Sequence, residues 1–438
     1  MRLILSAFIL LLVFSHIFSW DLSLAPGLSA KNAVLYIAMS IIGFRLIVSG
    51  NLKMEMSGFV GCYAALIAYA IATWLIAGLF IEYKGYAMLA TGITLKNSLV
   101  DPLIFFLTFL FGVRNSDDAI KLVKVLLVGG ILINLATLGD AFHIYSLGNY
   151  EEPGGRGRMA GPLGEANQYA AFIAMFLPAL CVAMAGSRGI GRALWALGVA
   201  ISFGALLTTA SRGAFVALPL SVILGAYTFR NYLAADKIRP WLVKGALSGI
   251  VIIGVISLKF GQLLTDRIVG ESKSAAGLGD FSSGRTEFWI EPISRMMSHP
   301  ITLITGFGWD TYDSMGFLFA PHNQYLYLWF TLGIPGVILG SIIYLIPMST
   351  ARNAVSTADA NARPYLIAFW LSVAATMIAI FFAQIFTPWP YFWSYAGLTM
   401  RLAINARAKQ SPVSDDELEG RSPNAAVGRD PRSSPARI

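Results

Sequence analysis

Long apolar runs, separated by short polar connections, dominate the chain. Twelve runs approach the length of about 20 residues that crosses a bilayer as an α-helix. They cover residues 3–19, 31–48, 58–80, 98–113, 122–139, 166–185, 193–209, 213–229, 241–260, 324–346, 364–382 and 391–404. The pattern predicts an all-α, polytopic integral membrane protein with about 12 transmembrane helices. The first run resembles a signal peptide, but no small-residue cleavage site follows it, which favours a retained helix.

One polar stretch, residues 261–320, interrupts this pattern. It contains the sequences GRTEFW and ITGFGWDTY, and the sequence PHNQYLYLWFTLGIPG follows it directly. Irregular backbone facing lipid leaves polar groups unpaired, so the stretch belongs in water or over a water-filled cavity. We expect four regions: helices 1–9 in 1–260, a long outer loop with the catalytic motifs in 261–320, helices 10–12 in 321–405, and a disordered cytoplasmic tail in 406–438.

Composition agrees with a membrane protein. The chain has 438 residues, of which 56% are hydrophobic and 13% charged, and its mean hydropathy of +0.66 is too high for a soluble domain. The net charge of +8 comes from basic residues scattered at helix ends, which argues against nucleic acid as a partner. Cys62 and Cys181 lie in apolar runs, so no disulfide framework or CxxC metal site is available.

The distribution of Lys and Arg favours a cytoplasmic N-terminus, because basic residues concentrate in the connections that this orientation places inside. If the N-terminus is cytoplasmic and successive helices alternate in direction, four separate stretches emerge together on the outer side. They contain Arg156–Arg158, Ser211–Arg212, Arg285 and His322. We therefore expect them to converge on one face of the membrane.

Arg212 lies between two apolar runs, in LLTTASRGAFVALPL. An arginine at this depth is costly unless it meets an anion or extends to the interface, so an anion site and an interfacial arginine are both open interpretations. Ser211 and Gly213 favour a close turn between two helices.

Arg285 follows the flexible sequence SSG and opens a segment with helical spacing of apolar residues, including Trp289 and Ile293. We expect an amphipathic helix on the outer surface, with its aromatic residues toward lipid headgroups. Arg285 would then lie at the outer membrane surface, above the expected site. The alternative interpretation is that Arg285 only contacts headgroup phosphates.

His322 lies where the polar stretch re-enters the membrane, between Pro321 and Asn323. An imidazole, with an ordinary pKa of about 6.5, suits activation of a hydroxyl group. A structural histidine is the alternative. Gly306, Gly308, Gly333 and Gly336 predict tight turns around it, and Asn323 is placed to orient a neighbour.

Arg156 and Arg158 stand among glycines in EEPGGRGRMAGPLGEANQYA. A mobile anion-binding loop and a merely solubilising loop explain them equally well. No outer pair of carboxylates indicates a divalent metal, and no P-loop or Rossmann fingerprint is present. A reaction there needs an already activated substrate, and arginines with one base suit a pyrophosphate leaving group and a hydroxyl nucleophile.

These motifs resemble the O-antigen ligase and polymerase family of bacterial inner-membrane glycosyltransferases. The resemblance rests on GR…W from Arg285, GFGW from Gly306, HNQYL with LGIPG from His322, RMAGPLGEANQYA from Arg158 and TASRGA around Arg212. It covers the second half of the chain in motifs.

The resemblance implies a multi-pass inner-membrane enzyme that transfers a glycan from undecaprenyl pyrophosphate on the periplasmic face, inverting and without a metal or other cofactor. The acceptor is a lipid A–core sugar in ligases and a second lipid-linked glycan in polymerases. Arg212 and Arg285 would hold the pyrophosphate, and His322 would orient or deprotonate the acceptor. Further substrate-binding candidates are Arg158, Arg156, Asn323 and Trp289.

Two other functions stay open. A flippase for lipid-linked oligosaccharides fits the helix count, although carriers place their ionisable residues near the membrane midplane. A protein O-oligosaccharyltransferase shares the motifs but commonly carries a longer C-terminal region than this chain.

Overall fold

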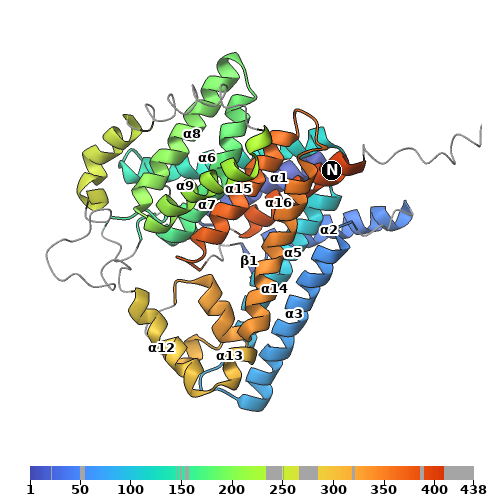
Figure 1. Ribbon diagram of the computed structural model, residues 1–438, viewed down its shortest axis with the longest axis vertical. Coiled ribbons are helices and arrows are strands. Elements are labelled where there is room, and N and C mark those ends of the chain that lie inside the picture. The colour runs from blue at the N-terminus through green and yellow to red at the C-terminus, as the bar shows by residue number, and fades with distance from the viewer. Residues whose placement is uncertain are drawn as a thin grey trace, which may run out of the picture.

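The computed structural model describes residues 1–20, 22–49, 55–145, 147, 150–152, 157–232, 249, 251–265, 285–317, 321–384 and 389–408. These residues are mostly helical, with one two-stranded hairpin (Figure 1). The elements are α1 Arg2–Ile17, β1 Ser23–Ala25, β2 Leu28–Ser29, α2 Ala30–Val48, α3 Ser57–Ile76, η1 Ala77–Ile81, α4 Met88–Leu95, η2 Lys96–Val100, α5 Asp101–Phe111, α6 Ser116–Ala141, η3 Gly161–Leu163, α7 Ala166–Ala185, α8 Gly189–Thr209, α9 Arg212–Thr228, η4 Arg230–Tyr232, α12 Arg285–Ser298, α13 Ile301–Thr305, η5 Asp313–Met315, α14 Gln324–Ala354, α15 Arg363–Ala379 and α16 Trp389–Ala408. Residues Val251–Thr265 form a further apolar helix.

Each predicted apolar run overlaps a helix, and only the second half of the run 241–260 is described. Within the described residues, seven helices are long and apolar enough to cross a membrane, and four shorter apolar helices accompany them. The membrane class is therefore confirmed, while the number of about 12 spans stays a prediction. The expected disordered tail falls almost wholly outside the described residues.

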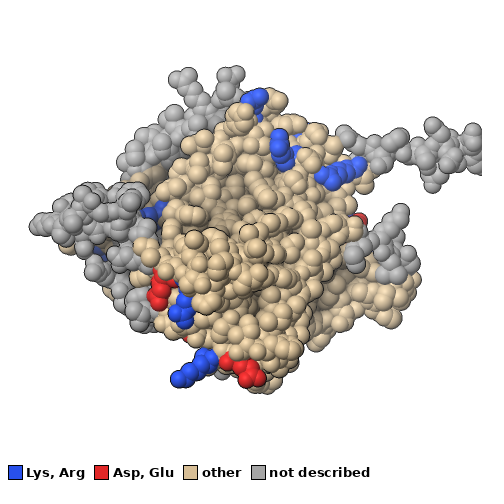
Figure 2. All heavy atoms as spheres, turned by 60° about the horizontal axis from the view of Figure 1, so that its bottom comes forward, with Lys and Arg blue, Asp and Glu red and all other residues tan. Residues whose placement is uncertain are grey.

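Apolar side chains also cover the outside of the helical bundle. Ile37, Phe44 and Val48 on α2 are 59%, 70% and 70% exposed, and Figure 2 shows a broad uncharged face with charged side chains mainly toward its edges. In a soluble protein such a surface would be an aggregation hazard, whereas lipid solvates it well.

Helix α14 departs from the predicted span 324–346. Its 31 residues contain a break at Gly333, with φ 63° and ψ −161°. A Cβ placed on Gly340 would lie 2.7 Å from Leu328 Cδ1, although a straight helix would separate these positions by about 18 Å. The chain therefore reverses at Gly333. Residues 324–332 reach only about 13 Å, too short to cross a bilayer, while residues 334–354 reach about 31 Å.

A smaller unit, which we call the lower lobe, lies below the bundle in Figure 1 and consists of α12, α13, residues 306–317 and residues 324–332. It has its own apolar cluster, separate from the large core of the bundle. The cluster comprises Met296, Phe307, Tyr312, Leu326, Tyr327 and Phe330. The predicted polar loop is thus largely folded where it is described, since aromatic residues within it bury one another.

Candidate functional site

The turn between α8 and α9 presents Arg212 at the first position of α9. Ala210 adopts the left-handed conformation, with φ 46°, which lets the chain reverse between the two helices. A Cβ on Gly213 would lie 2.7 Å from Phe382 Cβ. Only glycine permits this approach, so the expected close turn is confirmed and its neighbour is the end of α15.

His322 is held immediately before α14. It adopts φ 45° and is partly exposed. The Asn323 side chain caps the helix by accepting a hydrogen bond of 3.0 Å from the Leu326 N–H. The Gln324 N–H donates to the Ile380 carbonyl at 2.9 Å. Asn323 thus has a capping role here, while its expected contact with substrate stays a prediction.

Trp289 ties α12 to the same place. Its indole N–H donates to the Pro321 carbonyl at 2.7 Å, and its ring meets Phe381 edge-on with centroids 5.6 Å apart. The expectation that this aromatic residue faces lipid headgroups is therefore wrong, because the indole finds both a polar and an apolar partner within the protein. The expected helix begins at residue 285, one turn before Trp289. The Arg285 side chain lies outside the described residues.

The turn 380–382 at the end of α15 is the common neighbour of these elements. It contacts α9 through Phe382, α12 through Phe381 and the start of α14 through Ile380. The structure thus gathers Arg212, Trp289 and His322, which lie far apart in sequence, around one turn. Sequence reasoning missed this turn because its residues carry no reactive group, and no local signal identifies it.

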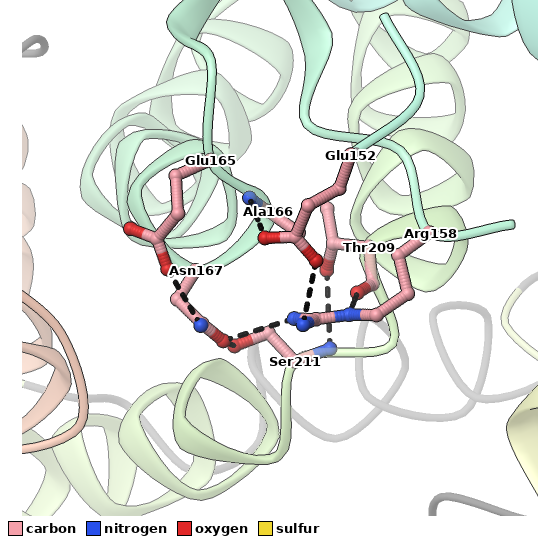
Figure 3. Close-up of polar contacts among 7 residues, drawn as sticks. All are labelled: Glu152, Arg158, Glu165, Ala166, Asn167, Thr209 and Ser211. Atoms are coloured by element: carbon pink, nitrogen blue, oxygen red, sulfur yellow. Dashed lines mark hydrogen bonds and ion pairs between the residues drawn. The ribbon is translucent and has the colours of Figure 1, made fainter. Parts of the chain in front are cut away.

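Arg158 lies against the α8–α9 turn, beside Thr209 and Ser211 (Figure 3). It is buried, and its guanidinium donates to the Thr209 carbonyl at 2.9 Å, to Glu152 at 2.9 Å and to the Asn167 side chain at 3.0 Å. Ser211 also donates to Asn167, at 3.0 Å. Arg158 thus joins the starts of α7 and α9 to the end of α8.

These bonds favour a positioning role for Arg158, next to Arg212, over a mobile anion-binding loop. Its own contact with substrate stays a prediction. Arg156, the other arginine of the loop, lies outside the described residues.

The two glycine motifs dock on each other. The helix breaks at Gly333, so the Thr331 carbonyl has no helical donor, and the Gly308 N–H supplies one at 2.9 Å. The Phe307 N–H likewise donates to the Phe330 carbonyl at 2.8 Å, beside the break at Gly333. Positive φ confirms the expected turns at Gly306, Gly308 and Gly333 but not at Gly336.

Asp310 follows this docking point. Its carboxylate accepts a hydrogen bond of 2.7 Å from the Tyr327 hydroxyl. Burial raises the pKa of the Asp310 carboxyl above its ordinary value, and the Tyr327 hydrogen bond offsets part of that rise. Among the described residues, no three His, Cys, Asp or Glu side chains gather as metal ligands. The expected independence from metal stays a prediction.

Comparison with known proteins gives one family match. Residues 197–340 match the family described as Wzy_C, O-antigen ligase. No curated protein matches the chain. The matched range begins within α8 and ends in α14, so it contains Arg212, Arg285, Trp289 and His322 but excludes Arg158.

Proposed function

We propose that this chain, whose residues 197–340 match the O-antigen ligase family, transfers a glycan from an undecaprenyl-pyrophosphate-linked donor to an acceptor sugar hydroxyl. The family suggests a glycosyltransferase with lipid-linked glycan substrates. The observation that carries the proposal is the gathering of Arg212, the first turns of α12 and His322 around residues 380–382.

The α9 terminus suits the pyrophosphate of the donor. Ser211 makes no side-chain hydrogen bond to the first N–H groups of α9, and its hydroxyl donates to Asn167 instead. The helix N-terminus and the charge of Arg212 thus lie at one place, which suits an anion. Arg285, which opens α12, would add a second guanidinium.

In the reaction, the acceptor oxygen attacks the anomeric carbon from the face opposite the pyrophosphate. The bond between that carbon and the pyrophosphate oxygen breaks, and undecaprenyl pyrophosphate departs with the bonding electrons. The acceptor proton passes to His322, or to water if His322 only orients the hydroxyl. Configuration at the anomeric carbon inverts, and the arginines stabilise charge as it develops on the leaving group.

The same chemistry serves both branches of the family. The acceptor is a lipid A–core sugar in a ligase and a second lipid-linked glycan in a polymerase. We place the protein in the bacterial inner membrane with this site toward the periplasm, which agrees with the basic residues in the opposite connections.

The test mixes purified protein with a lipid-linked donor and an acceptor, and measures release of undecaprenyl pyrophosphate. We expect release with wild type and almost none with Arg212→Ala. Arg212→Lys should recover only part of the activity, because lysine lacks the planar two-donor geometry. Transport of the donor across vesicles without release would instead support a flippase. Normal release by Arg212→Ala would place the pyrophosphate elsewhere.

A further inference from the structure

A polar cavity lies outside the proposed site, and its lining includes neither Arg212 nor His322. It measures about 390 Å³ and is bounded by α1, the β1–β2 hairpin, the start of α2, residues 93–105 and Pro390 of α16. This volume lies within the range of about 300–1,000 Å³ typical of ligand sites. The hairpin wall is fixed, because Gly27 packs against the Ile93 side chain.

The charges in this cavity do not balance. Asp101 is buried, and it accepts hydrogen bonds from Lys96 at 2.6 Å, Asn32 at 2.9 Å and Tyr36 at 2.5 Å. The Lys96 ammonium therefore neutralises the Asp101 carboxylate. Lys31 also lines the cavity and is partly buried, but no described residue forms an ion pair or hydrogen bond with its ammonium. Among the described residues, one positive charge of the cavity thus has no partner.

Neutral polar groups accompany that charge. His16 bonds through Nδ1 to the Leu12 carbonyl and to the Tyr391 hydroxyl, which leaves Nε2 without a partner among the described residues. Asn97 lines the cavity as an exposed side chain. A half-buried cation beside an imidazole and an amide suits an anionic group that also carries hydroxyls or ether oxygens.

The cavity lies beside lipid-facing surface. Leu24 of the hairpin, between the lining residues Ser23 and Ala25, is 63% exposed, and α2 exposes Ile37, Ile41 and Phe44 on the side that faces away from Lys31. A ligand with a charged head and hydrocarbon tails would place its head in the cavity and its tails in the surrounding lipid. A water-soluble anion would gain nothing from that apolar surface.

We propose that this cavity binds the phosphate-bearing head group of a membrane lipid, with the Lys31 ammonium on the phosphate. One cation that lacks a partner within the described part of the chain matches a single phosphate. Both a bulk phospholipid and a phosphorylated glycolipid carry this group.

The test measures lipid binding to the purified full chain by native mass spectrometry, with phosphatidylglycerol as the probe and phosphatidylcholine as a control without net charge. We expect Lys31→Ala to weaken phosphatidylglycerol binding by about tenfold or more, the factor for losing one charge-assisted hydrogen bond. Asn97→Asp should weaken it as well, since it adds a repelling carboxylate at an exposed position. Lys84→Ala, at another exposed lysine, should change nothing.

Competition by lipid A identifies the source of the head group. Displacement of phosphatidylglycerol by lipid A at lower concentration would indicate a glycolipid site, and the reverse order a phospholipid site. Unchanged binding in both Lys31→Ala and Asn97→Asp would overturn the proposal. Because glycan transfer is not the readout, this result is independent of the proposed enzyme activity.

Discussion

In the bundle, aromatic side chains fill much of the space between helices, although α16 also meets the α5 backbone, where a Cβ on Gly397 would lie 2.4 Å from the Phe106 carbonyl oxygen. In the lower lobe, two irregular backbone segments meet each other at their glycines. Trp393 of α16 packs edge-on against Tyr63 and Phe106, with centroids 5.4 Å and 6.2 Å apart. In the lobe, a Cβ on Gly333 would lie 2.0 Å from the Ile304 carbonyl oxygen, and one on Gly306 2.4 Å from the Thr331 oxygen. Large side chains repack more easily than main chain can move, so the lobe tolerates less change at its contacts.

Both regions contribute to the candidate site. The bundle supplies the α8–α9 turn and the end of α15, and the lobe supplies Trp289 and the approach to His322. The proposed reaction occurs where the two regions meet. Changes at the lobe contacts should therefore affect activity.

The largest effect is expected from Gly333→Ala. The added methyl group collides with the Ile304 carbonyl, and the positive φ of 63° strains any L-residue. We expect destabilisation by more than about 3 kcal/mol, measured by thermal unfolding in detergent. Gly61→Ala is the matched control, because nothing lies within 4 Å of that Cβ position. Equal stability of the two variants would refute the docking argument.

Next is His322→Ala, which tests the junction of the two regions. If His322 is the base, the variant should bind donor normally and transfer it about a hundredfold more slowly or worse. His322→Gln separates the roles, since partial activity with an unchanged pH profile indicates orientation alone. The measurement is turnover against pH with purified donor. A variant as fast as wild type would assign the HNQYL motif to structure only.

A smaller effect is expected from Arg158→Lys on the bundle side. Lysine keeps a charge near Glu152 but loses the fixed geometry that reaches Thr209 and Asn167. We expect a loss of about 2 kcal/mol in stability, together with weaker donor binding through the displaced α9 start. Arg212→Lys serves as the comparison and should lower transfer with little change in melting temperature. Intact stability with lost donor binding would instead make Arg158 a direct ligand.

The smallest effect concerns Asp310 in the lobe. Its pKa is raised in the folded protein, so the folded state holds the proton at pH values where the unfolded chain has released it. Stability should therefore fall as pH rises from the ordinary carboxyl pKa through the raised one. Asp310→Asn should flatten this dependence, seen as melting temperature against pH. An unchanged pH slope in the variant would assign the effect to other groups.

The sequence by itself determined the membrane class and the main apolar helices, and it predicts the side from which the candidate residues emerge. In lipid, an apolar run of spanning length must form a helix to pair its backbone polar groups. The alternation of helix directions then assigns each connection to one side of the membrane. The amphipathic helix from Arg285 and the turn at Gly213 also followed from local pattern, because helical spacing and a missing Cβ act over a few residues.

Only the tertiary structure decided which residues meet. The break at Gly333 turns one predicted span into a reversed pair, and its carbonyls find donors 23 residues earlier, as from Thr331 to Gly308. Trp289 turned toward Phe381, and Arg158 toward Thr209, since each found partners that no local pattern encodes. Partners distant in sequence are fixed by packing and by pairing of buried polar groups, and those depend on the whole fold.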